Sequence, residues 1–210
     1  MTTTTRPGGD ALSVGTPVTP RRPPRVWFAL ILGGGVLGAV AAAWQLVERI
    51  AYADGTNAGS ICEINSVLSC NSIFTHWQSS ALGVPNTLVS LPVFALLASA
   101  GLAGLLGSRL SRPYLATLFG LTVFMAGFMT WYMQQSAFAI GALCLFCTVG
   151  AVSLIAAGIG LTRVVDHAEA LGTRAVGIRL RLLTEARADL ILWIGLGALI
   201  AVLLVLGLAF

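Results

Sequence analysis

The sequence has no lysine and few charged residues of any kind. Its twelve basic residues are all arginine, and charged residues make up only 10% of the 210 positions. A soluble domain usually carries about 25% charged residues. The arginines stand beside apolar segments rather than along one surface, which argues against a nucleic-acid partner. Hydrophobic residues make up 57% of the chain, so the composition predicts an integral membrane protein with an all-α fold.

Long segments without a formal charge set the number of membrane spans. A spanning helix needs about 20 apolar residues. The segment 113–162 is long enough for two spans joined by a short turn at 134–136, whereas the segment 64–108 holds only one span because its first half is polar. With one span near each end of the chain, the sequence predicts five spans, at about 26–47, 85–107, 114–133, 138–161 and 190–210.

The arginines also predict an orientation. If the N-terminus is cytoplasmic, Arg49 is the only arginine that falls outside, and all the others fall on the inner side. This bias agrees with the positive-inside rule. We therefore expect a cytoplasmic N-terminus, a C-terminus outside, and the following parts: a disordered cytoplasmic tail 1–25, a four-helix core 26–162 with an outer loop 49–84, an amphipathic cytoplasmic linker 163–189, and a fifth span 190–210.

Four cysteines form two pairs, and the predicted orientation places both pairs at the outer face. Cys62 and Cys70 lie in the polar outer loop, and Cys144 and Cys147 form a CxxC near the outer end of the fourth span. Residues i and i+3 share a helix face, and a helix N-terminus stabilises a thiolate. Two dithiols on one side of a membrane indicate electron transfer by thiol–disulfide exchange. The apolar residues around the CxxC, Phe146 among them, would admit a lipid-soluble acceptor such as a quinone.

Two other interpretations of the cysteines stay open at this point. Even numbers of cysteines on an exported face often form structural disulfides. A bridge within one helical turn closes a very small loop, however, so its stabilising value is low for the CxxC pair. Four thiolates also suit a zinc ion, but an oxidising compartment disfavours this, and we predict no metal.

Several motifs together carry a resemblance to a known family. These are Cys62, the dipeptide Ser69-Cys70, the sequence Gly83-x-Pro85-Asn86 at the start of a span, and the CxxC at the outer end of a later span. In this order they resemble the vitamin K epoxide reductase family, and most of all its bacterial members. The resemblance covers about residues 26–161 and implies a four-helix bundle around a quinone of the menaquinone, ubiquinone or phylloquinone type. It also implies a bacterial cytoplasmic membrane with the site on its outer face.

The resemblance also implies roles for single residues. Cys62 and Cys70 would be the shuttle pair, Cys144 would exchange with Cys70, and Cys147 would meet the quinone ring. Asn86 matches the family's asparagine that hydrogen-bonds a quinone carbonyl. Ser69 matches a hydroxyl residue before the second loop cysteine. Phe146 and Trp77 are further candidates for the quinone site, although interfacial tryptophan and tyrosine residues, here Trp77, Trp131 and Tyr132, are normally membrane-surface anchors.

The sequence departs from the family in two ways. Some bacterial members continue into a fused thioredoxin-like domain, whereas this chain stops at Phe210. We therefore expect a separate exported thioredoxin-like protein of the DsbA type as the partner. Ala151 stands where animal enzymes carry a tyrosine, which favours plain quinone reduction over epoxide reduction.

The expected function is thus a membrane thiol:quinone oxidoreductase that supports disulfide formation in exported proteins. A DsbB-type enzyme is one alternative, but there the CxxC precedes the looser pair, the reverse of the order here. A non-enzymatic membrane protein with structural disulfides is the other.

Overall fold

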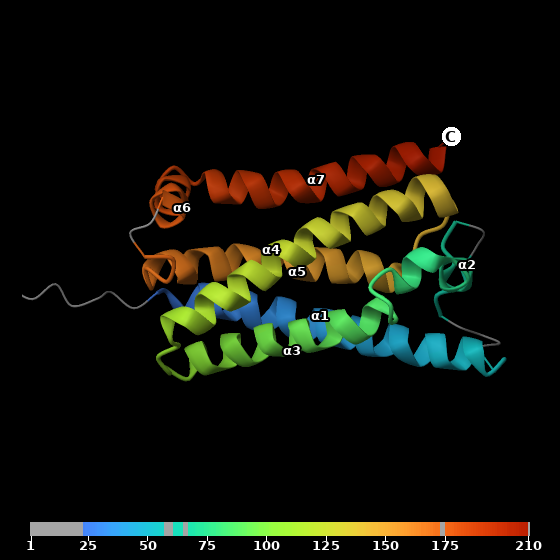
Figure 1. Cartoon of the computed structure of the whole chain (residues 1–210), viewed down its shortest axis with the longest axis horizontal. Helices are drawn as coiled ribbons and strands as arrows, with labels where there is room; N and C mark the ends of the chain where they lie inside the picture. The colour runs from blue at the N-terminus through green and yellow to red at the C-terminus, as the bar shows by residue number, and fades with distance from the viewer. Residues whose placement is uncertain (1–22, 57–60, 65–66, 173–174, 210) are drawn as a thin grey trace, which may run out of the picture.

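The chain folds as a bundle of long helices in a computed structural model, which describes residues 23–56, 61–64, 67–172 and 175–209 (Figure 1). Five helices are long and apolar enough to span a membrane, so the predicted all-α membrane fold is confirmed. The predicted tail 1–25 lies almost entirely outside the described residues. The elements are α1 (Arg25–Ala53), α2 (Cys70–Phe74), the 3₁₀ turn η1 (Trp77–Ser80), α3 (Asn86–Leu105), α4 (Arg112–Gln135), the π-helical turn η2 (Ser136–Ile140), α5 (Leu145–His167), α6 (Ala175–Glu185) and α7 (Ala188–Ala209).

Helix α1 packs closely against both α3 and α5 because it carries glycines where the backbones approach. A methyl group at Gly35 would overlap the backbone nitrogen of Ala98 in α3, and one at Gly34 would overlap the carbonyl oxygen of Ser153 in α5. Small residues allow this approach in membrane helices, where packing rather than hydrophobicity drives association. The neighbouring Gly33, by contrast, has open space around it.

This difference gives a matched pair of variants. We expect Gly35→Ala to destabilise the protein by about 1–3 kcal/mol, because the added methyl group must push α3 away. Gly33→Ala should instead be neutral or stabilise by about 0.5–1 kcal/mol, since it only removes the flexibility of a helical glycine. Thermal unfolding in detergent measures both. Equal effects of the two substitutions would contradict the packing described for Gly35.

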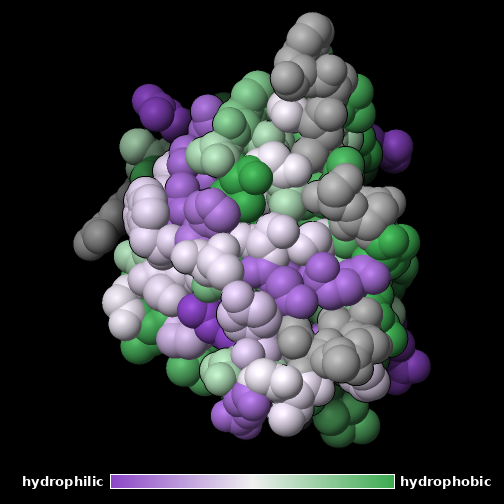
Figure 2. Space-filling model, turned by 90° about the vertical axis from the view of Figure 1, so that its right-hand side faces the viewer, coloured by the Kyte–Doolittle hydropathy of each residue, from purple (hydrophilic) through white to green (hydrophobic). Residues whose placement is uncertain are grey.

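The two ends of the bundle differ in character. One end carries the loop between α1 and α3, the start of α5 and the end of α7, and the other carries the start of α1, the α3–α4 turn and α6 (Figure 1). Viewed from the side of α2, polar side chains gather in the middle of the surface and hydrophobic side chains border them (Figure 2). This is the pattern of a membrane protein seen end-on, with its loops in water. The start of α1 and the end of α7 lie at opposite ends.

The turn that the sequence predicts at 134–136 does not exist. Helix α4 continues through these polar residues into η2, and the chain turns only at Gly141, whose φ is 72°. Only glycine adopts this left-handed conformation without strain. Ser136 is buried, and its hydroxyl donates to the carbonyl of Ala142, which satisfies the polar group inside the bundle. Phe138 therefore belongs to the end of the third span, and the fourth span begins at Leu145 rather than at Phe138.

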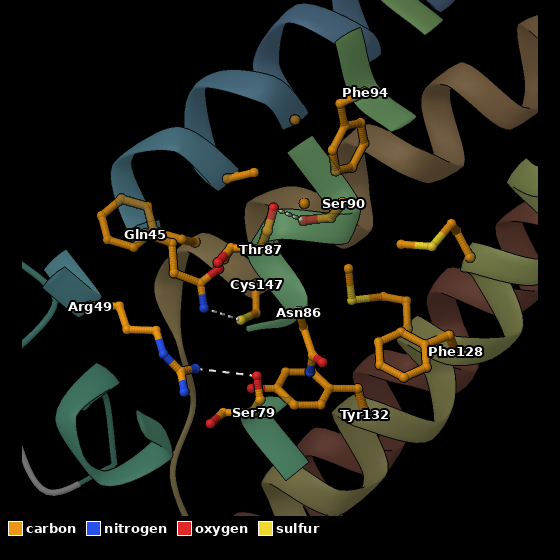
Figure 3. A pocket seen from close by; sticks show the side chains of 16 residues that line it. Gln45, Arg49, Ser79, Asn86, Thr87, Ser90, Phe94, Phe128, Tyr132 and Cys147 are labelled. Carbon is orange, nitrogen blue, oxygen red and sulfur yellow. Dashed lines mark hydrogen bonds between the residues drawn. The ribbon is translucent and has the colours of Figure 1, made fainter. Parts of the chain in front are cut away.

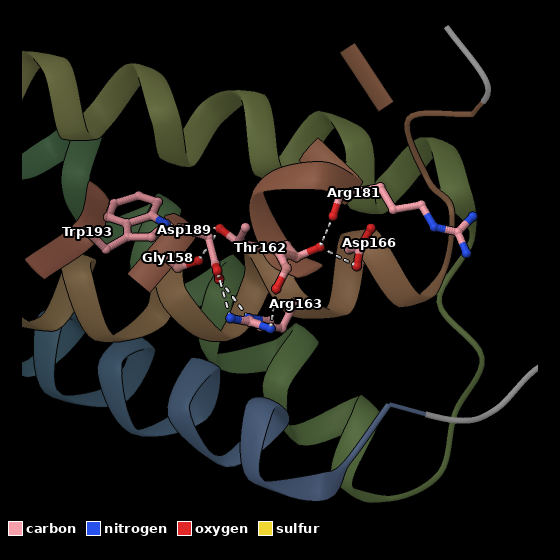
Figure 4. A network of polar contacts seen from close by, with 8 residues as sticks. Gly158, Thr162, Arg163, Asp166, Arg181, Asp189 and Trp193 are labelled. Carbon is pink, nitrogen blue, oxygen red and sulfur yellow. Dashed lines mark hydrogen bonds and ion pairs between the residues drawn. The ribbon is translucent and has the colours of Figure 1, made fainter. Parts of the chain in front are cut away.

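Helix α5 also extends past the expected boundary at 162, so Arg163 lies inside a span and not in a linker. Its guanidinium donates two hydrogen bonds of 2.7 Å to the carboxylate of Asp189 at the start of α7 (Figure 4). A third hydrogen bond of 3.1 Å reaches the carbonyl of Thr184 in α6. The Trp193 indole donates to the Thr162 hydroxyl at 3.0 Å. These contacts attach α6 and α7 to the four-helix core.

Candidate functional site

The loop that carries the first cysteine pair is held by a carboxylate. Ser69 is the N-cap of α2, and its hydroxyl accepts the N–H of Ser72 at 3.1 Å. Glu63 accepts from the Ser69 hydroxyl at 3.1 Å and from the Asn71 N–H at 2.7 Å. A side-chain acceptor at the first turn satisfies N–H groups that have no partner within the helix. Glu63 and Ser69 thus fix the position of Cys70, which is the first residue of α2.

Backbone pairing brings this loop to the CxxC. Leu68 and Leu143 form a parallel β-bridge. The Ser69 N–H donates to the Leu143 carbonyl at 3.1 Å, and the Leu143 N–H donates to the Val67 carbonyl at 2.6 Å. Each bridge residue lies one or two positions before a cysteine, so the pairing aligns Cys70 with Cys144.

The sulfur atoms lie as this pairing requires. Cys62 and Cys70 form a disulfide, whereas Cys144 and Cys147 are free thiols. The sulfur atoms of Cys70 and Cys144 are 3.3 Å apart, and those of Cys62, Cys70 and Cys144 all lie within 4.8 Å of one another. Exchange requires a thiolate to approach one sulfur of a disulfide, and this arrangement provides that approach. Three clustered cysteines also resemble a metal site, but two of them are bonded to each other here.

Cys144 stands at the N-cap of α5, where its sulfur accepts the Cys147 N–H at 3.4 Å. The helix N-terminus favours a thiolate there, but burial disfavours the charged form more strongly. Burial therefore raises the pKa of the Cys144 thiol, and the neighbouring Cys147 raises it further. As a thiol, Cys144 is a poor nucleophile toward the loop disulfide.

Cys147 faces a cavity inside the bundle, between α1, α3, α4 and α5 (Figure 3). The Gln45 amide donates to the Cys147 sulfur at 3.2 Å. Cys144 is not among the residues that line this cavity. The CxxC therefore has one sulfur toward the loop and the other toward the cavity. The described lining comprises Gly38, Ala42, Gln45, Arg49, Ser79, Asn86, Thr87, Ser90, Phe94, Met125, Phe128, Met129, Tyr132, Phe146, Cys147 and Gly150.

Arg49 holds the loop over this cavity. Its guanidinium donates to the Ser79 carbonyl at 3.2 Å and to the Ser80 hydroxyl at 2.9 Å, and it lies 5.6 Å from the centre of the Phe74 ring. The contacts fasten η1 and α2 to the end of α1. Arg49, the one arginine on the predicted outer side, thus stabilises the end of the bundle that carries the cysteines.

Comparison with known families agrees with this arrangement. A model of the vitamin K epoxide reductase (VKOR) family matches residues 29–160. The chain belongs to the VKOR family. Comparisons with curated proteins and with solved structures gave no match. As a VKOR-family member, the protein is a multi-pass membrane thiol–disulfide oxidoreductase. The match includes all four cysteines and Asn86, whereas α6 and α7 lie beyond it.

Asn86, the residue that the VKOR resemblance assigns to a quinone carbonyl, lies on the cavity. Its Nδ2 donates to the Gln78 carbonyl at 2.8 Å, while its Oδ1 is buried and has no partner among the described residues. The Thr87 hydroxyl on the same wall is also buried without a partner among the described residues. Buried polar atoms are normally paired. The Asn86 oxygen therefore suits a ligand group that donates, such as a hydroxyl, and the Thr87 hydroxyl suits a ligand oxygen of either kind.

The other two residues considered for the quinone site are placed differently. Phe146 lines the cavity beside Cys147. Trp77 does not line it: its side chain is 67% exposed and its ring lies 6.1 Å from that of Trp131. The structure therefore brings Cys147, Asn86 and Phe146 together and leaves Trp77 at the surface, as an aromatic anchor would be.

Sequence reasoning missed two residues at this VKOR site. Gln45 lies within the first predicted span, and a glutamine in an apolar helix is a signal in itself, because a buried amide needs a partner. Tyr132 was expected among the surface anchors, yet it is 4% exposed and lines the cavity. The rotation of α4 about its own axis decides whether Tyr132 lies at the surface or lines the cavity. The mostly apolar sequence of this helix does not resolve that rotation.

Proposed function

We propose that this VKOR-family protein oxidises a separate exported thioredoxin-like protein and passes the electrons to a membrane quinone. The observation that carries the proposal is the order of the sulfur atoms. Cys70 lies 3.3 Å from Cys144, and Cys147, one helical turn away, faces the cavity. Electrons thus have a continuous path from the loop pair to the interior of the bundle.

The relay consists of two exchanges and one reduction. The partner's dithiol reduces the Cys62–Cys70 disulfide and becomes a disulfide itself. The Cys70 thiolate then attacks Cys144 of the oxidised CxxC, and Cys147 leaves as a thiolate. Cys62 attacks Cys70, which restores the loop disulfide and frees Cys144. The CxxC pair finally gives two electrons and two protons to the quinone and returns to a disulfide.

A disulfide in the loop and free thiols in the CxxC would belong to the stage of this relay just before the last step. The raised pKa of Cys144 supports the forward direction at this stage. A Cys144 thiolate would attack Cys70 and return the electrons to the loop, and burial keeps Cys144 as a thiol. The Gln45 amide supports the other half of the pair, because a hydrogen bond to sulfur stabilises Cys147 as the leaving group.

The residues that line the cavity suit a quinone head group chemically, but the cavity must widen to hold one. Asn86 offers an acceptor and a second N–H, and Phe146 and Phe128 offer ring faces. The volume is about 40 Å³, which suits water molecules rather than an aromatic ring. Met125 and Met129 line one wall. Methionine side chains are flexible enough to move aside for a ring.

An assay with purified components tests the proposal. The protein, a reduced DsbA-like protein and a menaquinone analogue are mixed without oxygen, and quinol is measured by absorbance. We expect one quinol for each partner disulfide formed. Partner oxidation without quinol would show that the acceptor is something else, and an absence of both would reject the function.

The contact between the loop and the CxxC predicts a specific cross-link. In the variant Cys62→Ser/Cys147→Ser only Cys70 and Cys144 remain, and we expect mild oxidation to join them rapidly. The matched variant Cys70→Ser/Cys147→Ser leaves Cys62 and Cys144. These two should join at least about tenfold more slowly, because a sulfur atom that is out of line with its target attacks poorly. Peptide mapping by mass spectrometry identifies the bonds. Equal rates in the two variants would contradict the assignment of Cys70.

The charge bias predicts that the sulfur end faces outward. Ile64 in the cysteine loop is 60% exposed and Val176 in α6 is 64% exposed. In intact cells we expect an impermeant maleimide to label Ile64→Cys and to leave Val176→Cys unlabelled until the membrane is broken. The reverse pattern would place the relay in the cytosol.

A further inference from the structure

A large cavity lies at the end of the bundle away from the cysteines. Its volume is about 600 Å³. It lies between the start of α1, the turn between α3 and α4, and the end of α5, which Figure 1 places together at the end that carries α6. Nothing in the proposed electron relay uses it.

The rim of this cavity is cationic. Arg25, Arg109 and Arg112 line it together with His167, and the described lining residues include no carboxylate. Arg112 lies 3.6 Å from Glu169, in a pair with both side chains more than 60% exposed. Neither Arg25 nor Arg109 takes part in an ion pair among the described residues. Arg25 and Arg109 therefore bring positive charge to the cavity that no carboxylate of the described residues pairs, and Arg112 is paired only with the exposed Glu169.

The floor of the cavity is apolar. Phe28, Leu115 and Val164 line it, and their exposed fractions are 8%, 2% and 1%. Arginines at the ends of spans lie at the level of lipid head groups, and residues one to two turns deeper reach acyl-chain depth. A cationic rim above an apolar floor matches a molecule with an anionic head and a hydrocarbon tail.

We propose that this cavity binds an anionic phospholipid, with the phosphate at Arg25, Arg109 and Arg112 and an acyl chain against Phe28 and Leu115. Basic pockets between spans on the cytoplasmic side are a recurrent form of lipid recognition. Free phosphate would leave the apolar floor uncovered. The N-terminal segment 1–22 is a poor occupant, because it carries three arginines and one aspartate and the cavity repels such a charge.

A lipid titration of the full-length protein in neutral detergent tests this proposal without any assay of turnover. The probes are phosphatidylglycerol, phosphatidylcholine with the same acyl chains, and inorganic phosphate, and binding is measured by native mass spectrometry and by thermal stabilisation. We expect phosphatidylglycerol to bind at least fivefold more tightly than phosphatidylcholine, and phosphate to give no stabilisation. Arg109→Gln and Arg112→Gln should each weaken phosphatidylglycerol binding roughly fivefold.

The matched control is Arg179→Gln, which removes an exposed arginine of α6 that does not line the cavity. It should keep the wild-type affinity. Ser108→Glu keeps every arginine and adds a negative charge at the cavity, so it should weaken binding even if an arginine variant folds poorly. Equal affinity for the two lipids, equal stabilisation by inorganic phosphate, or equal losses in Arg109→Gln and Arg179→Gln would overturn the proposal. So would a gain of about tenfold in affinity after deletion of residues 1–22, since the tail would then be the occupant.

Discussion

Cys147→Ser is expected to lower quinol formation by about a thousandfold or more, the scale of loss seen when a reacting side chain is removed. Cys147 is the only one of the four cysteines among the described lining of the cavity. Cys144 faces the loop, so it cannot replace Cys147 at the acceptor. The hydroxyl of serine neither forms a disulfide nor carries two electrons. Turnover with a reduced DsbA-like protein and a menaquinone analogue measures the loss.

A second variant, Cys62→Ser, tests the preceding exchange, because it should accumulate a disulfide between Cys70 and Cys144. In that variant Cys70 still attacks the oxidised CxxC, but the Cys62 thiol that would attack Cys70 and free Cys144 is missing. Thr148→Ala is the control for Cys147→Ser, because it alters the same helical turn, where the Thr148 hydroxyl donates to the Cys144 carbonyl at 3.2 Å, and leaves every sulfur in place. It should turn over within a few-fold of wild type. Quinol formation at the wild-type rate by Cys147→Ser would show that its assigned role is wrong.

Asp189→Ala is expected to have the largest effect on stability, about 3–5 kcal/mol. The Asp189 side chain is 3% exposed and that of Arg163 is 16% exposed, and two hydrogen bonds of 2.7 Å join them. Removal of the carboxylate leaves the Arg163 guanidinium partly buried with one hydrogen bond to Thr184 and a ring contact with Trp27 at 5.5 Å. Thermal or denaturant unfolding in detergent measures the change.

An exposed pair in the same region is the matched control. Arg181 and Glu185 are 3.2 Å apart on α6, with side chains 65% and 63% exposed. Glu185→Ala should cost about 0.5 kcal/mol or less, because water already solvates both charges. The double change Arg163→Met/Asp189→Leu should recover much of the loss, since it removes both charges from the buried position. A small effect of Asp189→Ala would mean that α7 is held by its apolar contacts alone.

The sequence predicted the helical membrane fold well because the spans depend on composition over long segments. It also located the four cysteines and Asn86, because the CxxC and the motif around Pro85 combine spacing with residue type. The close contact of Cys70 with Cys144 was implied only by the family resemblance. Local sequence patterns do not predict contacts between residues 74 positions apart. The bridge between Leu68 and Leu143 brings the two cysteines together, and neither leucine stands in a motif that indicates it.

The errors have a common physical origin. Polar residues at 134–136 indicated a turn, but Ser136 found a buried acceptor and the helix continued to Gly141. Arg163 indicated the end of a span, but Asp189 neutralises it within the bundle. Tyr132 indicated a surface anchor, but α4 turns it inward. In each case a tertiary partner changed the meaning of a polar residue, and single-sequence patterns do not contain that partner.

All four cysteines are shielded from solvent in this structure. Cys62 and Cys70 are fully buried, Cys144 is 1% exposed and Cys147 is 7% exposed. Small thiols dissolved in the surrounding medium therefore have little access to any of the four cysteines in this conformation. In the proposed relay, reduction of the loop pair then requires a conformational change first, and a partner that binds near Cys70 would lower the free energy of that change.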